Sequence, residues 1–242
     1  QPNAMGGREV GGLANQLAAH MDFTPQDVDR VGRFWGAKDM ATAPGLKAVD
    51  MFRAAAEGKI RFMWILATNP AVSLPDTELV RRALERCEFV VVSDCSADTD
   101  TAAYADLLLP AAPWGEKDGT VTNSERCISR QRALQPLSGQ ARPDWWAITQ
   151  VAHRLGHQAA FPYCSQADVF REHAALSAFE NEGRRAFDIG ALAHLDDENY
   201  SELPPTTWPA RADGGAVRPF ADGHFFTPSG RARFVSVTPA MP

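Results

Sequence analysis

The sequence lacks the paired cysteines of a zinc ribbon or an iron–sulfur cluster. Its four cysteines are widely spaced and include no CxxC pair: Cys87, Cys95, Cys127 and Cys164. Both kinds of metal centre need thiolates at short spacing, so we predict no metal-ligating residue in this chain. Disulfides are rare in the cytosol, so we interpret the four cysteines as reduced thiols and expect a cytoplasmic protein.

Long apolar runs and a basic excess are also absent. No run approaches the roughly 20 apolar residues of a membrane-spanning helix, so we predict no membrane span. The formal net charge of −6 offers no broad basic surface, and we expect no nucleic-acid partner. The chain begins Gln1-Pro2-Asn3, with neither an initiator Met nor a secretion signal, which suggests an internal piece of a longer chain.

The common nucleotide and catalytic signatures are missing as well. No two glycines stand at i and i+2, so there is no GxGxxG, and GxxxxGK[ST] and HExxH are absent too. His153 and His157 are four residues apart, but Gly156 interrupts the helical pattern. We therefore predict a structural role for this pair rather than a metal site.

What is present is an alternation of buried strands and amphipathic helices. Short apolar runs of strand length predict strands at 60–67, 89–92 and 106–109. Helical patterns are predicted at 46–57, 76–87, 143–155 and 166–179. Strand, helix and strand at this spacing predict an α/β fold, a parallel sheet with helices on both faces.

The composition changes along the chain and suggests three parts. Residues 1–45 mix Gly, polar residues and short apolar stretches, and we interpret them as an irregular lead-in segment. The predicted α/β domain occupies 46–200. From 201 to 242 the chain becomes rich in Pro and Gly, which predicts a linker leading toward a further domain.

Polar residues follow two of the predicted strands. Asn69 comes after the first strand, and Ser93 and Asp94 after the second. Ligands of open parallel sheets bind beyond the carboxyl ends of the strands. Asn and Asp side chains there suit a ribose or a purine edge. The alternative is that these residues only cap the helices that follow.

Two further candidates stand outside the strands. Lys117 lies between Gly115 and Gly119, where its ammonium could reach a phosphate; the alternative is a solvated surface Lys. Asp144 stands between Pro143 and Trp145 at a helix start, and its alternative is an ordinary N-cap. Residues alone thus predict an α/β domain with a polar rim that binds a nucleotide-like ligand.

Several segments in order resemble the bacterial assimilatory nitrate reductases, within the prokaryotic molybdopterin oxidoreductase family. The likeness covers most of residues 1–150 and the last 20. The first matching segment, 1–17, begins Gln1-Pro2-Asn3-Ala4-Met5-Gly6-Gly7-Arg8-Glu9-Val10-Gly11-Gly12. The others are 68–76, 93–94, 105–112, 116–120 with 122–126, and 227–234. Each motif is modest alone, but their order and spacing are specific.

The resemblance implies the central Rossmann-like domain of an enzyme that reduces nitrate to nitrite with a bis-(molybdopterin guanine dinucleotide) cofactor. The parent enzyme would also hold a [4Fe-4S] cluster, absent from this fragment, and would receive electrons from a donor protein or domain. Five residues match cofactor-binding positions: Asn69, Ser93, Asp94, Lys117 and Asp144.

Gln1 and Arg8 match the segment that lines the active site near molybdenum. A guanidinium fork complements nitrate, a small planar oxyanion. Arg8 could instead pair with Glu9 or another carboxylate and be purely structural. The remaining domains of the parent enzyme are absent, so we expect no catalysis by this piece alone. The alternatives are a formate dehydrogenase or another oxyanion reductase of the family, and a non-catalytic nucleotide-binding module.

Overall fold

The computed structural model describes residues 3–211 and 218–238, and their contacts form two compact units. Unit 1 comprises the described residues of 1–44, 119–131 and 163–242, and unit 2 comprises 45–118 and 132–162. These boundaries differ from those suggested by composition, since the range 46–200 contributes to both units. The roles assigned to the three composition ranges stay predictions.

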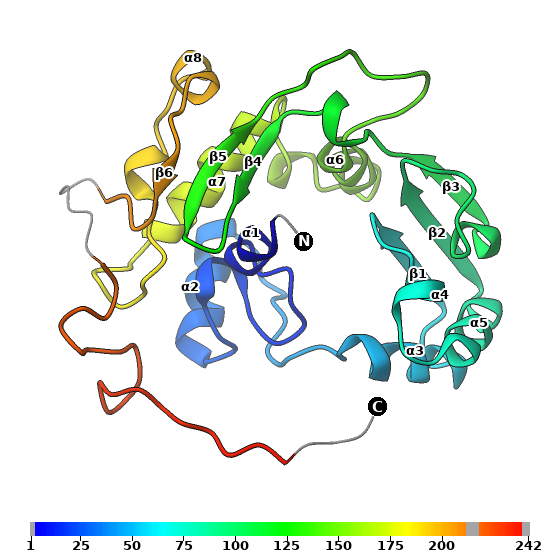
Figure 1. The fold of residues 1–242 in the computed structure, drawn as a ribbon, viewed down its shortest axis with the longest axis horizontal. Helices are drawn as coiled ribbons and strands as arrows, with labels where there is room; N and C mark the ends of the chain where they lie inside the picture. The colour runs from blue at the N-terminus through cyan, green and yellow to red at the C-terminus, as the bar shows by residue number, and fades with distance from the viewer. Residues whose placement is uncertain (1–2, 212–217, 239–242) are drawn as a thin grey trace. The chain divides into compact units, whose positions relative to one another are not determined.

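Unit 2 is built on a parallel sheet in the order β1-β2-β3 (Figure 1). Its strands are β1 (Phe62–Leu66), β2 (Phe89–Asp94) and β3 (Leu107–Pro110). Met63 pairs with Val90 and Ile65 with Val92, which puts all four side chains on one face. The predicted α/β class with a parallel sheet is confirmed.

Helices α3 (Ala48–Ala56) and α5 (Thr77–Arg86) cover that face, together with the short α4 (Pro70–Ser73). Helix α5 begins where Asp76 accepts a hydrogen bond from the backbone N–H of Leu79, as an N-cap does. Its apolar stripe contributes Val80, Ala83 and Leu84 to the core. Burial of this stripe against the sheet stabilises the helix more than its intrinsic propensity does.

The opposite face of the sheet is exposed where its strands begin, whereas Val91 and Ser93 on the same face are 5% and 2% exposed. Phe62 is 55%, Phe89 43% and Leu107 43% exposed, and the rings of Phe62 and Phe89 stack 6.3 Å apart between centroids. The sequence predicted helices on both faces. In the described part of unit 2 the core lies between the sheet and α3, α4 and α5 on one face.

Unit 2 is completed by short 3₁₀ turns and one long helix. These are η2 (Ala102–Tyr104), η3 (Trp114–Glu116), α6 (Asp144–Arg154) and η4 (Gln158–Ala160). His153 Nε2 lies 2.7 Å from the carbonyl oxygen of Phe161, which anchors the chain after α6. This contact agrees with the structural role predicted for His153.

Unit 1 contains an antiparallel sheet that the strand pattern did not predict. Its strands are β4 (Gly119–Thr122), β5 (Cys127–Gln131) and β6 (Thr206–Thr207). Arg126 closes the β4–β5 turn with φ of 67°, a conformation that Asn or Gly adopts more readily. The sequence predicted no strand in this range, while Lys117 itself lies outside the sheet, between η3 and β4.

Helices pack against this sheet, and three of them, one a 3₁₀ helix, fall in the range 1–45 that the sequence predicted to be irregular. The helices of unit 1 are α1 (Ala4–Glu9), η1 (Ala18–His20), α2 (Pro25–Trp35), α7 (Gln166–Ala178), η5 (Gly190–Leu192) and α8 (Asp197–Ser201). Helix α2 has a recognisable start signal in the sequence. Thr24 accepts from the backbone N–H of Asp27, and Pro25 follows as the first helical residue. None of the described helices meets the length and apolarity needed to cross a membrane.

The core of unit 1 joins segments that are distant in sequence. Phe187 is fully buried, and its ring centroid lies 5.3 Å from that of Trp208 in an edge-on contact. Leu203 and Trp208, from the range predicted to be a linker, are each 5% exposed. The chain up to Trp208 therefore belongs to a packed unit.

Candidate functional site

The carboxyl edge of the sheet in unit 2 gathers the predicted cofactor-binding residues. Asn69 follows the end of β1, while Ser93 and Asp94 are the last two residues of β2. Leu66 pairs with Ser93 in a parallel register, so the two strands end at the same edge. A shared binding site needs these residues at one edge of the sheet, and the observed strand order and register place them there.

A fourth segment extends the edge beyond β3. Ala111 and Arg142 form a parallel bridge, in which Arg142 N–H donates to the carbonyl of Pro110 at 3.0 Å. Helix α6 begins two residues later at Asp144. Asp144 therefore also lies at the carboxyl edge, next to the residues that follow β3.

Lys117 and Asp144 form an ion pair at this edge. Lys117 Nζ donates to Asp144 Oδ2 at 3.2 Å, and the two side chains are 26% and 28% exposed. The surface alternative for Lys117 and the N-cap alternative for Asp144 are therefore wrong: Lys117 is half-buried, and the N-cap of α6 is Pro143.

The second carboxylate oxygen of Asp144 is the unusual atom of the site. Asp144 Oδ1 is buried and has no hydrogen-bond partner in the described part of the chain. Leaving a buried acceptor unsatisfied costs about 1–3 kcal/mol. Such an atom fits a ligand that presents N–H donors.

Asn69 and Ser93 are held by neighbours. Asn69 Oδ1 accepts hydrogen bonds from the N–H and hydroxyl of Thr101 at 3.1 and 2.6 Å. Asn69 occupies the N-cap position of α4 but makes no side-chain cap bond there, so the capping alternative fails for it. Ser93 is 2% exposed and accepts from Trp64 Nε1 at 2.8 Å.

Asp94 has a local role in the loop after β2. Its Oδ1 accepts from the backbone N–H of Ser96 at 3.2 Å, the geometry of an Asx turn. Asp94 therefore shapes the loop beyond the strand rather than capping a helix.

Two residues at this edge were missed by the sequence reasoning. Ala67, directly after β1, has φ of 53°, a left-handed conformation that is costly for a residue with a Cβ and clusters at binding sites. Glu116 is buried and accepts from the N–H and hydroxyl of Ser138. Those bonds hold the pKa of Glu116 below its usual range and fix the loop that carries Lys117.

Arg8 lies in unit 1, near the end of α1. Its side chain is exposed, and no hydrogen bond or ion pair of its guanidinium is found within residues 3–211 and 218–238. The alternative that Arg8 pairs with Glu9 is therefore not observed. Gln1, the other predicted active-site residue, lies outside the described residues.

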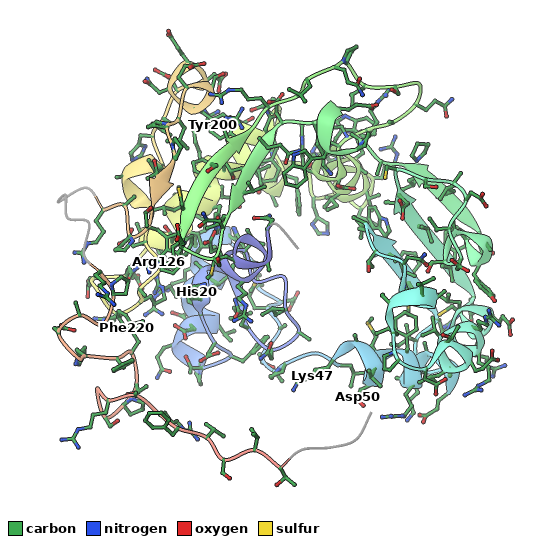
Figure 2. The ribbon with its side chains drawn as sticks, viewed as in Figure 1. His20, Lys47, Asp50, Arg126, Tyr200 and Phe220 are labelled. Carbon is green, nitrogen blue, oxygen red and sulfur yellow. The ribbon has the colours of Figure 1, made fainter. Side chains whose placement is uncertain are left out.

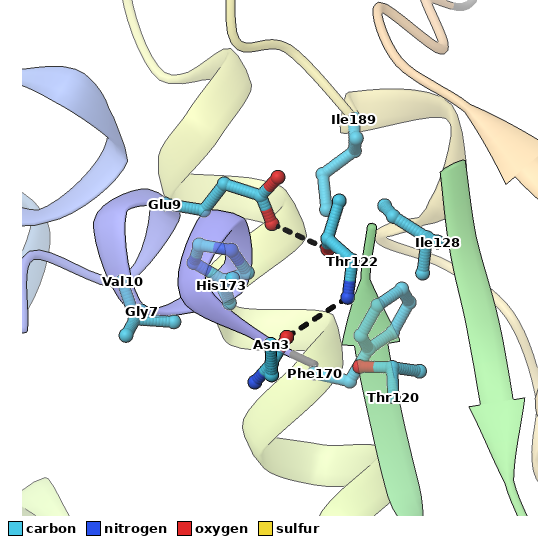
Figure 3. Close-up of a pocket in the computed structure, with 11 residues that line it drawn as sticks. Asn3, Gly7, Glu9, Val10, Thr120, Thr122, Ile128, Phe170, His173 and Ile189 are labelled. Atoms are coloured by element: carbon cyan, nitrogen blue, oxygen red, sulfur yellow. Dashed lines mark hydrogen bonds between the residues drawn. The ribbon is translucent and has the colours of Figure 1, made fainter. Parts of the chain in front are cut away.

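A cavity of about 110 Å³ adjoins α1 in unit 1 (Figure 3). Its lining includes Asn3, Glu9, Thr122 and His173. Burial raises the pKa of Glu9, although hydrogen bonds from Thr122 and Trp208 oppose the shift. Burial also lowers the pKa of His173 to about 4, with a smaller contribution from His20.

His20, labelled in Figure 2, has a pKa lowered by burial and by the charge of Arg8. A lowered His pKa means that the unfolded chain binds the proton first, so stability is lost as the pH falls. Glu9 acts in the opposite sense: its raised pKa makes stability greatest at low pH and reduces it as the pH rises.

We expect His173 to make this chain less stable to urea at pH 5 than at pH 7. The pKa of His173 falls from its ordinary value of 6.5 to about 4 in the folded state. The free energy of unfolding should therefore be about 2 kcal/mol lower at pH 5 than at pH 7. His173→Gln should remove that part of the pH dependence, whereas His194→Gln, at an exposed position, should not. The same pH dependence in His173→Gln and the unchanged chain would contradict the assignment.

This chain is similar to a known protein family and to named members of it. Residues 5–154 match the molybdopterin oxidoreductase family. The chain is 52% identical over 239 residues to a nitrate reductase of Klebsiella oxytoca, covering 99% of this chain and 27% of that protein. It is 50% identical over 247 residues to a nitrate reductase of Shewanella frigidimarina, covering 100% and 26%.

More distant relatives carry other names. The alpha subunit of an F420-dependent formate dehydrogenase of Methanococcus maripaludis is 33% identical over 176 residues, covering 73% of this chain and 26% of that protein. Acetylene hydratase from Pelobacter acetylenicus shares the fold with a TM-score of 0.55 at 19% identity, over 84% of this chain and 26% of that one. The chain thus spans about a quarter of the length of these proteins. Since the family match covers more than half of its residues, the chain belongs to the molybdopterin oxidoreductase family.

Proposed function

We propose that this chain is part of a molybdenum enzyme that reduces nitrate to nitrite, and that it binds a guanine dinucleotide portion of the cofactor without being active alone. The observation that carries the proposal is the carboxyl edge of unit 2, where the buried, unpartnered Oδ1 of Asp144 lies beside the Lys117 ion pair.

The donors and acceptors of this edge fit a guanine nucleotide. Guanine presents N–H donors on its pairing edge, which a carboxylate such as Asp144 accepts. Asn69 uses its Oδ1 on Thr101, so its amide N–H₂ is the group that would bind a ligand oxygen. Lys117 supplies a positive charge suited to a phosphate. Ser93 and Asp94 would complete the contacts to the sugar or base.

The cofactor, when bound, supplies the oxygen-atom and two-electron chemistry. The residues of this chain bind and orient it. Arg8 would hold nitrate through the planar guanidinium fork, and its positive charge would favour the anion. We propose Gln1 as its companion, on the resemblance of the segment 1–12.

Nitrate is favoured over formate by the relatives. Identity is 52% and 50% to proteins named nitrate reductase, over nearly all of this chain, against 33% to the formate dehydrogenase subunit over 73% of it. Formate oxidation remains the second candidate. A non-catalytic nucleotide-binding module is disfavoured because the similarity to a protein named nitrate reductase covers 99% of this chain and thus both units.

Further parts of the proposal concern the parent enzyme. It would use the bis-(molybdopterin guanine dinucleotide) form, a [4Fe-4S] cluster outside this chain, and an electron-donor protein or domain, in nitrate assimilation. The four cysteines are free thiols, which supports a cytoplasmic location.

The test uses the full-length parent enzyme with a reduced viologen dye as electron donor. We expect nitrate-dependent dye oxidation with one nitrite formed for every two molecules of this one-electron dye oxidised, and no reduction of oxidised dye by formate. The 242-residue chain alone, as the matched control, should show neither activity. Formate oxidation without nitrate reduction would replace the proposal by its second candidate.

A further inference from the structure

We propose that Glu9 is a positioning residue that sets helix α1, and with it Arg8, for nitrate binding. The inference rests on the proposed function of Arg8. Glu9 follows Arg8 directly at the end of α1 and is 3% exposed. Successive helical residues point about 100° apart, so a fixed Glu9 fixes the direction of Arg8.

Two neutral donors hold the carboxylate from two different segments. Thr122 Oγ1 in β4 donates to Glu9 Oε2 at 2.8 Å, and Trp208 Nε1 donates to Glu9 Oε1 at 2.5 Å. Both donors are buried, at 3% and 5% exposure. We call these three residues the Glu9 clamp.

Thr122 also contacts the N-terminal end of α1. Its backbone N–H donates to Asn3 Oδ1 at 2.8 Å, as Figure 3 shows. Asn3 occupies the N-cap position of α1 but makes no side-chain cap bond. One residue of β4 therefore holds both ends of a helix only six residues long, which would be marginal without such contacts.

Trp208 is itself anchored. Its backbone N–H donates to the carbonyl of Arg126, whose Nε donates back to the Trp208 carbonyl at 3.0 Å. The Arg126 guanidinium lies 5.3 Å from the Trp208 ring centroid (Figure 2 labels Arg126). The indole that holds Glu9 is therefore part of the core and cannot follow a shift of α1.

A carboxylate is an expensive choice for this position if stability alone is at stake. No ion pair of Glu9 is found in the described ranges, and burying an unpaired charge is unfavourable. What the carboxylate offers is two directed acceptors that reach β4 and Trp208 at once. The arrangement fits orientation of α1 better than general stabilisation.

The test compares Glu9→Ala with Glu9→Gln in the full-length enzyme. Glu9→Ala removes both bonds and should raise the KM for nitrate about tenfold, with kcat changed less than about twofold. Glu9→Gln should stay within about twofold of the unchanged enzyme, because its carbonyl still accepts from Trp208 and its amide can donate to Thr122. Glu125→Ala, exposed in the same unit, is the matched control and should have no effect.

Hydrogen exchange of α1 gives a readout that does not need the loaded enzyme. Amides that bond within this segment, such as those of Val10 and Gly12, should exchange faster in Glu9→Ala than in Glu9→Gln. Equal exchange in the two variants, or a lower kcat with unchanged KM in Glu9→Ala, would overturn the proposal. A wild-type enzyme that reduces no nitrate would instead overturn the proposed function, and the exchange result would still decide on the clamp.

Discussion

Replacing Arg8 by Ala in the full-length enzyme is expected to lower kcat/KM for nitrate about 1,000-fold. Nitrate has three equivalent oxygens in one plane, and a guanidinium presents two parallel N–H donors to such an anion. Arg8→Lys keeps the charge but loses the fork, and a loss of about 100-fold is expected for it. The measurement is steady-state nitrate reduction, normalised to molybdenum content.

The position of Arg8 allows it to be replaced with little effect on the rest of the fold. Arg8 is exposed on α1, and its guanidinium makes no hydrogen bond or ion pair within the described residues, although its charge acts on His20. Its loss should therefore not disturb packing. Arg81→Ala is the control: Arg81 is also exposed on a helix, and it pairs with Glu78 at 3.1 Å. Unchanged kinetic constants in both Arg8 variants would remove Arg8 from the substrate site.

The second large effect concerns Asp144. In the full-length enzyme Asp144→Ala should weaken retention of the guanine dinucleotide about 10- to 100-fold, because hydrogen bonds to a charged partner contribute about 1.5–3 kcal/mol. It would also leave Lys117 without the carboxylate that now accepts from it at 3.2 Å. Molybdenum and the guanine nucleotide released on acid hydrolysis, per polypeptide, measure the outcome.

Two variants sharpen this test. Asp144→Asn retains one acceptor and should lose less cofactor than Asp144→Ala. Asp98→Asn changes an exposed carboxylate in the loop after β2 and should retain the full amount. Full cofactor content in Asp144→Ala would show that the unpartnered oxygen serves another purpose.

Sequence reasoning succeeded where local pattern and tertiary environment agree. Residues 89–92 were predicted as a strand because they are continuously apolar, and β2 spans Phe89–Asp94. The helix predicted at 76–87 is observed as Thr77–Arg86, since its apolar stripe matches the face that packs on the sheet. Parallel pairing then follows from the strand–helix–strand order, and it placed Asn69 and Asp94 at one edge in advance.

Pattern failed where short elements depend on distant partners. Helix α1 contains two adjacent glycines, Gly6 and Gly7, which disfavour a helix. It persists because Thr122 and Trp208, more than 100 positions away, hold Asn3 and Glu9. Likewise β4 pairs with β5 through a turn at Arg126, which adopts a left-handed conformation. An Arg does not predict such a turn, because Gly and Asn are the residues that favour this conformation.

The sequence by itself determined the α/β class, the edge of the sheet that carries polar residues, and the family resemblance. These depend on periodicity and order along the chain, which need no partner. Only the tertiary structure decided that Lys117 pairs with Asp144, that Asp144 Oδ1 is buried without a partner, and that Glu9 is held by β4 and Trp208. Those contacts join residues far apart in the chain, and the direction of a side chain is set by the packing of the whole unit.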